Sequence, residues 1–283
     1  MPFNLSEIIK AYFSYLDFKK KSVDSHHERY IFPLFCGTYF VYRKIDILRI
    51  VAIAKSLSSK PTYVDIGCGN CDFLEKILEY IPNAIGIEMD LSIYYLLGKK
   101  IPKYVISLPV ENINNRKFDL SFVGWMEHGI DFRKNVAKFS KCIVTTFDIG
   151  GQCGINGGCD YDDFGFSLVA SWKTPSWIDV NTELLNKYYT LSNDVKKYEQ
   201  LSKFRTAHNL WYIYSDQENY SKIKNELIKF LEFEEKLIST NRYDFETILD
   251  ELGFKYGEKL SIFSSDKNIN KTNEQLWKVV FHH

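Results

Sequence analysis

The chain has 283 residues and a formal net charge of zero, because 36 Lys and Arg residues balance 36 Asp and Glu residues. This balance argues against a dedicated nucleic-acid-binding protein, which would need clustered basic side chains. Aromatic residues make up 16% of the sequence, so we expect aromatic-lined pockets or surfaces in addition to an aromatic core.

No stretch of the sequence has the features of a secretion signal or of a membrane-spanning helix. The longest apolar run covers about residues 31–42, which is too short to cross a bilayer. The N-terminus also lacks a basic start and a small-residue cleavage site. We therefore expect a cytoplasmic protein with no membrane span, in which the six cysteines are reduced thiols.

The first predicted segment, residues 1–60, is helical. Apolar residues recur at helical spacing over about 5–20 and again over about 45–57. Ser-Ser-Lys-Pro at 58–61 ends the second helix. We expect this segment to lie on the lid or substrate side of a site.

Short β-rich runs then alternate with helical runs over residues 61–150. The predicted strands are 63–66, 84–87, 104–106, 118–123 and 142–146, and the predicted helices are 73–78, 94–97 and 132–139. Strands and helices that alternate with short links require a parallel sheet with crossover helices. The sequence therefore predicts an α/β core over these residues.

Residues 151–239 do not continue this alternation, and we expect an insertion or cap here. Six glycines lie within 149–165, and helices are predicted near 179–189 and 218–237. The aromatic side chains of this segment could wall a pocket that excludes water, or could form a small core packed on the sheet. These side chains are Tyr161, Phe164, Phe166, Trp172 and Trp177.

The last segment, residues 240–283, is expected to complete the α/β core. A helix over 243–252 is closed by Gly253, and strands at 259–264 and 276–283 form a terminal hairpin. Together with the five earlier strands, the sequence predicts a seven-stranded sheet that is mostly parallel.

The glycine loop that follows the first predicted strand is the candidate binding site. Ligands of open α/β sheets bind beyond the carboxyl ends of the strands, and Gly67 and Gly69 would allow the backbone to turn tightly. The dinucleotide pattern G-x-G-x-x-G fails, because Asp72 stands where the third glycine belongs. Asp65, two residues before the first glycine, would repel a pyrophosphate and would favour a cationic group such as an ammonium.

A second acid, Glu88, stands 21 residues beyond Gly67, at the end of the second predicted strand. An acid at this place can accept hydrogen bonds from both hydroxyls of a ribose. The two acids together predict a ligand that is a nucleoside with a positive charge and no phosphates. S-adenosylmethionine fits that description.

The sequence around these acids resembles the class I S-adenosylmethionine-dependent methyltransferase family. The resemblance covers about half of the chain and rests on VDIGCGNCDFL (64–74), GIEMD (86–90), KFDLSFVGWMEH (117–128) and the C-terminal pieces YDFETILDELGF, LSIFSS and LWKVVF. It implies a Rossmann-like α/β fold, S-adenosylmethionine as cofactor and methyl transfer as the reaction. The family's first motif is commonly D-x-G-x-G-x-G, and Cys71 replaces its third glycine, a change that a negative φ would accommodate.

The resemblance also implies a role for each site residue. Asp65 and the loop amides would hold the methionine part of the cofactor, Glu88 the ribose, and Met89 would lie against the adenine. The family often has an acid after the third strand, where Glu111 could serve here. The residues expected to bind the cofactor are Asp65, Gly67, Gly69, Glu88, Met89, Glu111 and Trp125.

The acceptor is expected beyond the fourth strand, at Gly124-Trp125-Met126-Glu127-His128. His128 has the pKa range of a general base, or it is a polar cap of the next helix. Glu127 could bind an amine. We expect these two residues to be the catalytic ones, with no metal. A small or medium-sized organic acceptor is favoured over a protein side chain, and no basic stripe points to nucleic acid.

Several alternatives remain open from the sequence. Cys68 and Cys71 could be half of a zinc site with Cys153 and Cys159, a redox pair or simply small buried thiols. The glycine turn could bind no ligand. The whole chain could be a non-catalytic binding module of the same fold, or an aminopropyl-type transferase whose polyamine would meet three loop acids, Asp160, Asp162 and Asp163.

Overall fold

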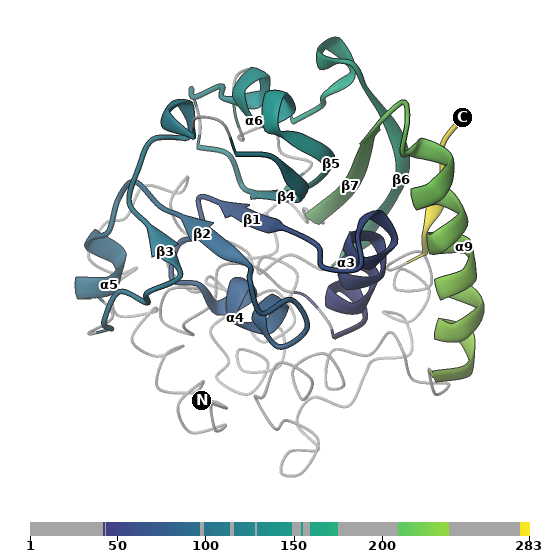
Figure 1. The fold of residues 1–283 in the computed structure, drawn as a ribbon, viewed down its shortest axis with the longest axis horizontal. Helices are drawn as coiled ribbons and strands as arrows, with labels where there is room; N and C mark the ends of the chain where they lie inside the picture. Colours follow the sequence, from purple (N-terminus) through teal and green to yellow (C-terminus); the bar gives the residue numbers. More distant parts are fainter. Residues whose placement is uncertain are drawn as a thin grey trace, which may run out of the picture. The chain divides into compact units, whose positions relative to one another are not determined.

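An eight-stranded sheet with helices on both faces forms the part of the protein that the structure describes (Figure 1). The computed structural model describes residues 42, 44–96, 99–113, 116–127, 129–148, 154, 159–174, 209–237 and 278–283. All but a few of these belong to one unit, formed by residues 45–172, 209–237 and 279–283.

The strands lie side by side in the order β3-β2-β1-β4-β5-β7-β6-β8. They are β1 (Tyr63–Ile66), β2 (Ile85–Ile87), β3 (Val105–Ile106), β4 (Phe118–Gly124), β5 (Ser140–Asp148), β6 (Phe166–Thr174), β7 (Asn209–Asp216) and β8 (Val280–Phe281). The five strands from β3 to β5 pair in parallel, whereas β7 pairs antiparallel with β5, and β8 with β6. The chain order reverses between the neighbours β1 and β4, which is the point at which such sheets bind ligands.

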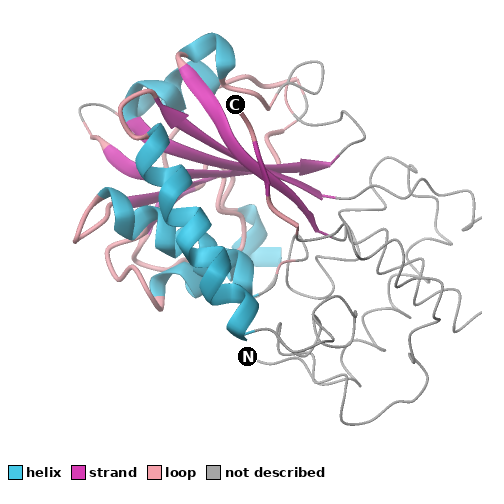
Figure 2. Cartoon of the chain, turned by 90° about the vertical axis from the view of Figure 1, so that its right-hand side faces the viewer, coloured by secondary structure: helices cyan, strands magenta, loops and turns pink. Residues whose placement is uncertain are grey.

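The helices of the described residues are distributed over the two faces of this twisted sheet (Figures 1 and 2). They are α3 (Lys44–Leu57), α4 (Asp72–Leu78), α5 (Ser92–Leu96), α6 (Arg133–Phe139) and α9 (Tyr220–Leu237), with short 3-10 turns η1 (Val110–Asn112) and η2 (Asp162–Phe164). Among these residues, no helix combines the length and the apolar character that a membrane crossing requires.

Strand β1 is buried along its whole length, and this position explains its composition. All four of its side chains, in the sequence YVDI, are buried, because β1 pairs with β2 on one side and β4 on the other. Central strands of parallel sheets are covered on both faces and are therefore nearly continuous in apolar residues. Asp65 is the exception, and a buried carboxylate in such a strand calls for an explanation.

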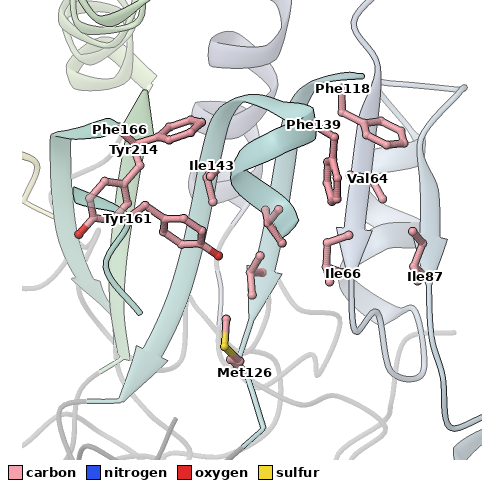
Figure 3. Packing of buried hydrophobic residues seen from close by; sticks show 12 residues of the cluster. Val64, Ile66, Ile87, Phe118, Met126, Phe139, Ile143, Tyr161, Phe166 and Tyr214 are labelled. Atoms are coloured by element: carbon pink, nitrogen blue, oxygen red, sulfur yellow. The ribbon is translucent and has the colours of Figure 1, made fainter. Parts of the chain in front are cut away.

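One face of the sheet packs against α6 and η2. Val136 and Phe139 of α6 join Val64, Ile143 and Tyr214 of the strands in a single buried cluster (Figure 3). The ring of Phe139 meets that of Phe118 edge-on, at 5.8 Å between centroids. Interlocked packing of this kind fixes the strands whose carboxyl ends carry the site.

The opposite face carries a continuous row of aromatic rings. Phe73 of α4 lies 4.6 Å from Phe122 of β4 and 5.9 Å from Trp211 of β7, centroid to centroid. Trp211 stacks on Trp172 of β6 at 5.5 Å with nearly parallel planes. Successive side chains of a strand point to opposite faces, so the side chains of Phe122 and its neighbour Val123 pack on opposite faces of the sheet.

The structure confirms the α/β core and corrects the rest of the sheet. All five strands predicted between 61 and 150 are present, as are the helices between them. The described residues form eight strands where seven were expected for the chain, and β6 and β7 arise from the segment that was expected to be an insertion. Strand–helix alternation is a sign of parallel strands, whereas β7 pairs antiparallel with β5, and β6 with β8, so this pattern does not reveal them.

The C-terminal hairpin is only partly covered by the structure. Its second strand corresponds to β8, which pairs with β6, while the first, 259–264, lies outside the described residues. The helices expected at 5–20, 179–189 and 243–252 also lie outside them. The helices predicted at 45–57 and 218–237 correspond to α3 and α9.

A buried ion pair links α3 to α9. The Arg49 guanidinium donates two hydrogen bonds to the Glu234 carboxylate, at 2.9 and 2.6 Å, and both residues are buried. Asp46 lies one helical turn from Arg49, at 3.7 Å. The same guanidinium sits 5.0 Å above the Trp172 ring. Arginine in this setting combines a bidentate carboxylate contact with stacking on an aromatic face.

We expect Glu234→Ala to lower the free energy of unfolding by about 3–5 kcal/mol, because the arginine charge stays buried without its main partner. Replacement of the pair by Arg49→Met and Glu234→Leu together should cost less than the single change. Urea denaturation measures both, with Lys76→Ala as control, since its pair with Glu79 is about half exposed and worth about 0–1 kcal/mol. Equal losses for Glu234→Ala and Lys76→Ala would contradict this role.

Candidate functional site

The candidate site lies where the carboxyl ends of β1, β2 and β4 meet. The loop Gly67–Cys71 connects β1 to α4, and Glu88 directly follows β2. Gly67 and Cys68 both donate their backbone N–H groups to the Ile87 carbonyl, at 2.8 and 3.1 Å. These bonds tie the start of the loop to the end of β2.

Three residues of this loop have a left-handed backbone. The φ angles are +68° for Gly67, +53° for Gly69 and +65° for Cys71. Glycine adopts such angles without strain, whereas a residue with a Cβ does not. The negative φ that would have accommodated a cysteine at position 71 is therefore not present, and Cys71 has a backbone conformation that favours glycine.

Side-chain contacts surround Cys71 in this unfavourable conformation. Its side chain is fully buried, with the Sγ atom 2.9 Å from the Tyr94 hydroxyl and 3.6 Å from Cys68 Sγ. Its N–H donates to the Cys68 carbonyl, and its own carbonyl accepts from Glu75 in the first turn of α4. Strained residues persist where their surroundings over-determine them, and Cys71 fits that description.

Cys68 requires a glycine opposite it in the sheet. A Cβ added to Gly86 of β2 would lie 2.6 Å from Cys68 Sγ and 2.8 Å from Leu74 Cδ2. Both distances are below van der Waals contact, so a side chain at position 86 would require the Cys68 and Leu74 side chains to shift. Sequence reasoning missed Gly86, although a glycine in the middle of a strand is a known sign of close backbone approach.

Asp65 is a buried carboxyl group with acidic neighbours. Burial raises its pKa well above the ordinary value, and Cys71, Asp72 and Glu88 raise this pKa further. Its side chain is 3% exposed. Within the described part of the chain, no basic side chain forms an ion pair with it. A cationic ligand group beside Asp65 would supply the missing opposite charge.

Glu88 holds the loop and keeps capacity for a ligand. Its Oε2 accepts the Gly69 N–H at 2.8 Å, and its Oε1 accepts the Asp90 N–H at 3.0 Å. Burial raises the pKa of Glu88, and the hydrogen bonds from Gly69, Asp90 and Met89 partly offset this. Each carboxylate oxygen offers two lone pairs, so hydroxyl donors can still bind.

Most N–H groups of the loop, in contrast, already donate hydrogen bonds within the protein. The N–H groups of Gly67, Cys68, Gly69 and Cys71 donate to protein acceptors, and the Asp72 N–H donates to Asn70 Oδ1 at 3.3 Å. The expectation that these amides hold part of the cofactor is therefore not supported. A phosphate-binding loop points free N–H groups at its anion, and this loop does not have that arrangement.

Met89 and Glu111 are exposed residues at the ends of neighbouring strands. Met89 follows Glu88 after β2 and is 65% exposed, and Glu111 lies in η1, five residues after β3 ends. Asp90 accepts the Ser92 N–H and thereby begins α5. Both Met89 and Glu111 are accessible to a ligand, and their contact with one stays a prediction.

Trp125 occupies the end of β4 in a left-handed conformation, with φ +57°. Its N–H donates to the Thr146 carbonyl at 2.9 Å. Its side chain packs on a small buried cluster formed by Phe147 and Cys159, together with Tyr212. Non-glycine residues at positive φ are uncommon and cluster at functional sites, and contact of Trp125 with a cofactor stays a prediction.

The proposed catalytic residues are described only in part. Glu127 is exposed, and its carbonyl accepts the Ile130 N–H in a turn, whereas His128 lies outside the described residues. Gly154 donates to the Met126 carbonyl and accepts from Gly129. The glycine-rich segment therefore touches the acceptor loop at this point.

The aromatic residues expected to wall a pocket are mostly core residues. Tyr161 and Phe166 belong to the same buried cluster as the strands, with Phe164 packed against it, and Trp172 is 1% exposed. This supports the alternative of a small core packed on the sheet. Phe166 and Trp172 are in strand β6, whose buried side chains the sequence pattern did not assign to the sheet. Trp177 lies outside the described residues.

Two further alternatives lose support. The aminopropyl-transferase alternative needs loop acids that can bind a polyamine. Asp160, one of the three candidates, already forms an ion pair with Arg133 at 3.0 Å. Cys159 packs against Phe147, in a cluster that does not include Cys68 and Cys71, and Cys153 lies outside the described residues. A shared zinc site for these cysteines therefore has no support from the described part of the chain.

The comparisons with known proteins give only remote likenesses. No family model and no curated protein matches the sequence. Among solved structures, the sugar N-methyltransferase KedS8 from Streptoalloteichus sp ATCC 53650 is 14% identical, with a TM-score of 0.30 over 46% of this chain. The chain spans 60% of the length of that protein.

Two more structures are similar at the same level. The plantazolicin methyltransferase BpumL in complex with SAH is 10% identical, with a TM-score of 0.35 over 62% of this chain and 85% of its own. The cyclase SpnF is also 10% identical, with a TM-score of 0.40 over 61% and 80%. The names include both methyltransferases and a cyclase, so the function of this chain has to be argued from its own residues.

Substitution of Cys71 tests the backbone strain in the loop. Cys71→Gly and Cys71→Ala both remove the thiol, but only glycine relieves the left-handed conformation. We expect Cys71→Gly to be more stable than Cys71→Ala by about 1–2 kcal/mol, measured by urea denaturation under reducing conditions. At Cys68, which has no positive φ, the order should reverse. Equal stabilities at position 71 would show that the backbone there is unstrained.

Proposed function

We propose that the protein is a class I S-adenosylmethionine-dependent methyltransferase. The observation that carries the proposal is the Asp65 carboxyl group, which is buried beside a glycine loop with acidic neighbours and has no cationic partner among the residues that the structure describes. A buried charge without a partner is costly, and a ligand that brings a cation removes that cost. S-adenosylmethionine carries an ammonium and a sulfonium, and it has no phosphates.

The second acid and the loop narrow the choice of ligand. Glu88 lies at the end of the adjacent strand, where it can accept hydrogen bonds from ribose hydroxyls. The N–H groups of Gly67, Cys68 and Gly69 are already used within the protein. A pyrophosphate would meet two acids and no free loop amides, which disfavours a dinucleotide and favours a cationic nucleoside.

The chain's own residues would then have distinct roles. Asp65 would pair with the cationic part of the cofactor and Glu88 would hold the ribose, with Met89, Glu111 and Trp125 around the adenosine. When bound, S-adenosylmethionine supplies a methyl group that is already activated for transfer. The protein has to orient the acceptor and exclude water.

We place the acceptor at the loop after β4, beside Trp125 and Glu127. The formal charge of zero disfavours nucleic acid as acceptor, and a small or medium-sized organic molecule is the preferred class. A protein side chain is the next choice. His128 is the proposed base, with Glu127 as a carboxylate that would bind an amine acceptor.

Calorimetry with S-adenosylmethionine and S-adenosylhomocysteine tests the cofactor assignment. Both ligands should bind, because both retain the ammonium and the ribose, while NAD should not bind, because its pyrophosphate would meet Asp65 and Glu88. Failure of S-adenosylmethionine to bind at tens of micromolar, or tighter binding of NAD, would overturn the proposal.

Transfer from methyl-labelled S-adenosylmethionine to a cell extract then identifies the acceptor class. Label in the low-molecular-mass fraction is the expected result. Label in protein would support the second choice. Label in nucleic acid would contradict the assignment from charge.

The role of Glu88 can be tested separately. Glu88→Ala should weaken S-adenosylmethionine binding by about 1–3 kcal/mol, because it removes ribose hydrogen bonds and also leaves the Gly69 N–H without its acceptor. Glu88→Gln keeps one carbonyl acceptor and should lose less. Asp90→Ala is a suitable control, because the Asp90 side chain holds Ser92 and not the loop. Unchanged affinity in Glu88→Ala would refute the assigned contact.

A further inference from the structure

The contact between Cys71 and Tyr94 is not explained by cofactor binding alone. Cys71 stands where a glycine would adopt the same backbone angle without strain. A chain that places cysteine there needs another means of keeping the loop in shape. Among the described residues, Tyr94 and Cys68 are the side chains within bonding distance of the Cys71 thiol.

The Tyr94 contact is close and buried. The Tyr94 hydroxyl lies 2.9 Å from Cys71 Sγ, and the two side chains are 1% and 0% exposed. The side-chain hydrogen bonds with Cys68 and Tyr94 lower the pKa of Cys71, and burial followed by the contact with Cys71 raises the pKa of Tyr94. Either the hydroxyl or the thiol can be the donor in the contact between Tyr94 and Cys71.

Tyr94 belongs to α5, which is already tied to the loop through its own start. Asp90 begins this helix by accepting the Ser92 N–H, and the Asp90 N–H donates to Glu88, which also accepts from Gly69. Glu88 therefore links the glycine loop to the segment before α5. Tyr94 provides a second link, one turn further along, to the other end of the same loop.

We propose that Tyr94 is a positioning residue of the cofactor site, which acts through Cys71 to keep the loop Gly67–Cys71 in its left-handed shape. In this arrangement the contact between the Tyr94 hydroxyl and the Cys71 thiol stabilises the left-handed backbone, which a glycine would adopt without support. The inference rests on the proposed function insofar as the loop is taken to border S-adenosylmethionine. Tyr94 is proposed to support the loop through Cys71, without contacting the ligand itself.

The test compares wild type with Tyr94→Phe, Cys71→Gly and the double variant, all under reducing conditions. Phenylalanine keeps the buried ring and removes only the hydroxyl. Tyr94→Phe should weaken S-adenosylmethionine binding about three- to tenfold, with a raised KM for the cofactor and an unchanged kcat. In the Cys71→Gly background the same change should alter affinity by less than about twofold, because glycine needs no support.

Tyr104→Phe is the matched control. Its hydroxyl donates to Glu75 of α4 at 3.2 Å and not to the loop, so its loss should leave affinity unchanged. An equal loss of affinity for Tyr94→Phe in both backgrounds would overturn the proposal, because it would show a structural role independent of Cys71. No loss in either background would overturn it as well.

Measurement of the unfolding equilibrium constants of the same four proteins tests this inference without any ligand, and therefore independently of the proposed function. If wild type does not bind S-adenosylmethionine, the proposed function fails, but the coupling between the two residues can still be measured. A coupling of about fivefold between Tyr94→Phe and Cys71→Gly supports the positioning contact. Strictly additive effects on unfolding would overturn it without reference to any ligand.

Discussion

Burial of the Asp65 carboxyl group, with no opposite charge beside it in the described part of the chain, is the constraint on which the candidate site depends. The central strand β1 is buried along its length, so Asp65 has little of the solvent contact that would ease its ionisation. Since its pKa is higher in the folded protein than in the unfolded chain, the folded state holds this proton more tightly. The free energy of unfolding of the ligand-free protein therefore falls as the pH rises from the unfolded-state pKa toward the folded-state pKa.

The glycine loop is shaped around this acid and not around an anion. Its amides are used to tie the loop to β2 and to Glu88, which leaves the two carboxyl groups as the main polar features that a ligand would meet. Glu88 is at once a support of the loop and a candidate ribose acceptor. Loss of Glu88 would therefore change both the loop geometry and the negative charge that a ligand meets, and matched variants are needed to separate the two effects.

Much of this arrangement could be predicted from the sequence, because the α/β core obeys local rules. Strand–helix alternation located β1 to β5, and the spacing of Asp65, Gly67 and Glu88 led to the candidate site. β6 and β7 escaped prediction because the alternation rule applies to parallel strands, whereas β7 pairs antiparallel with β5, and β6 with β8. The positive φ of Cys71 and the Tyr94 contact escaped it because both depend on packing between segments distant in sequence, which periodicity does not report.

The pKa of Asp65, followed by carbon-13 NMR of its carboxyl group with and without S-adenosylmethionine, tests the central claim most directly. The account predicts a pKa well above the ordinary aspartate range in the free protein, and a marked fall when the ligand brings its cation to the carboxylate. An ordinary pKa in the free protein, or a raised pKa that saturating S-adenosylmethionine leaves unchanged, would contradict it.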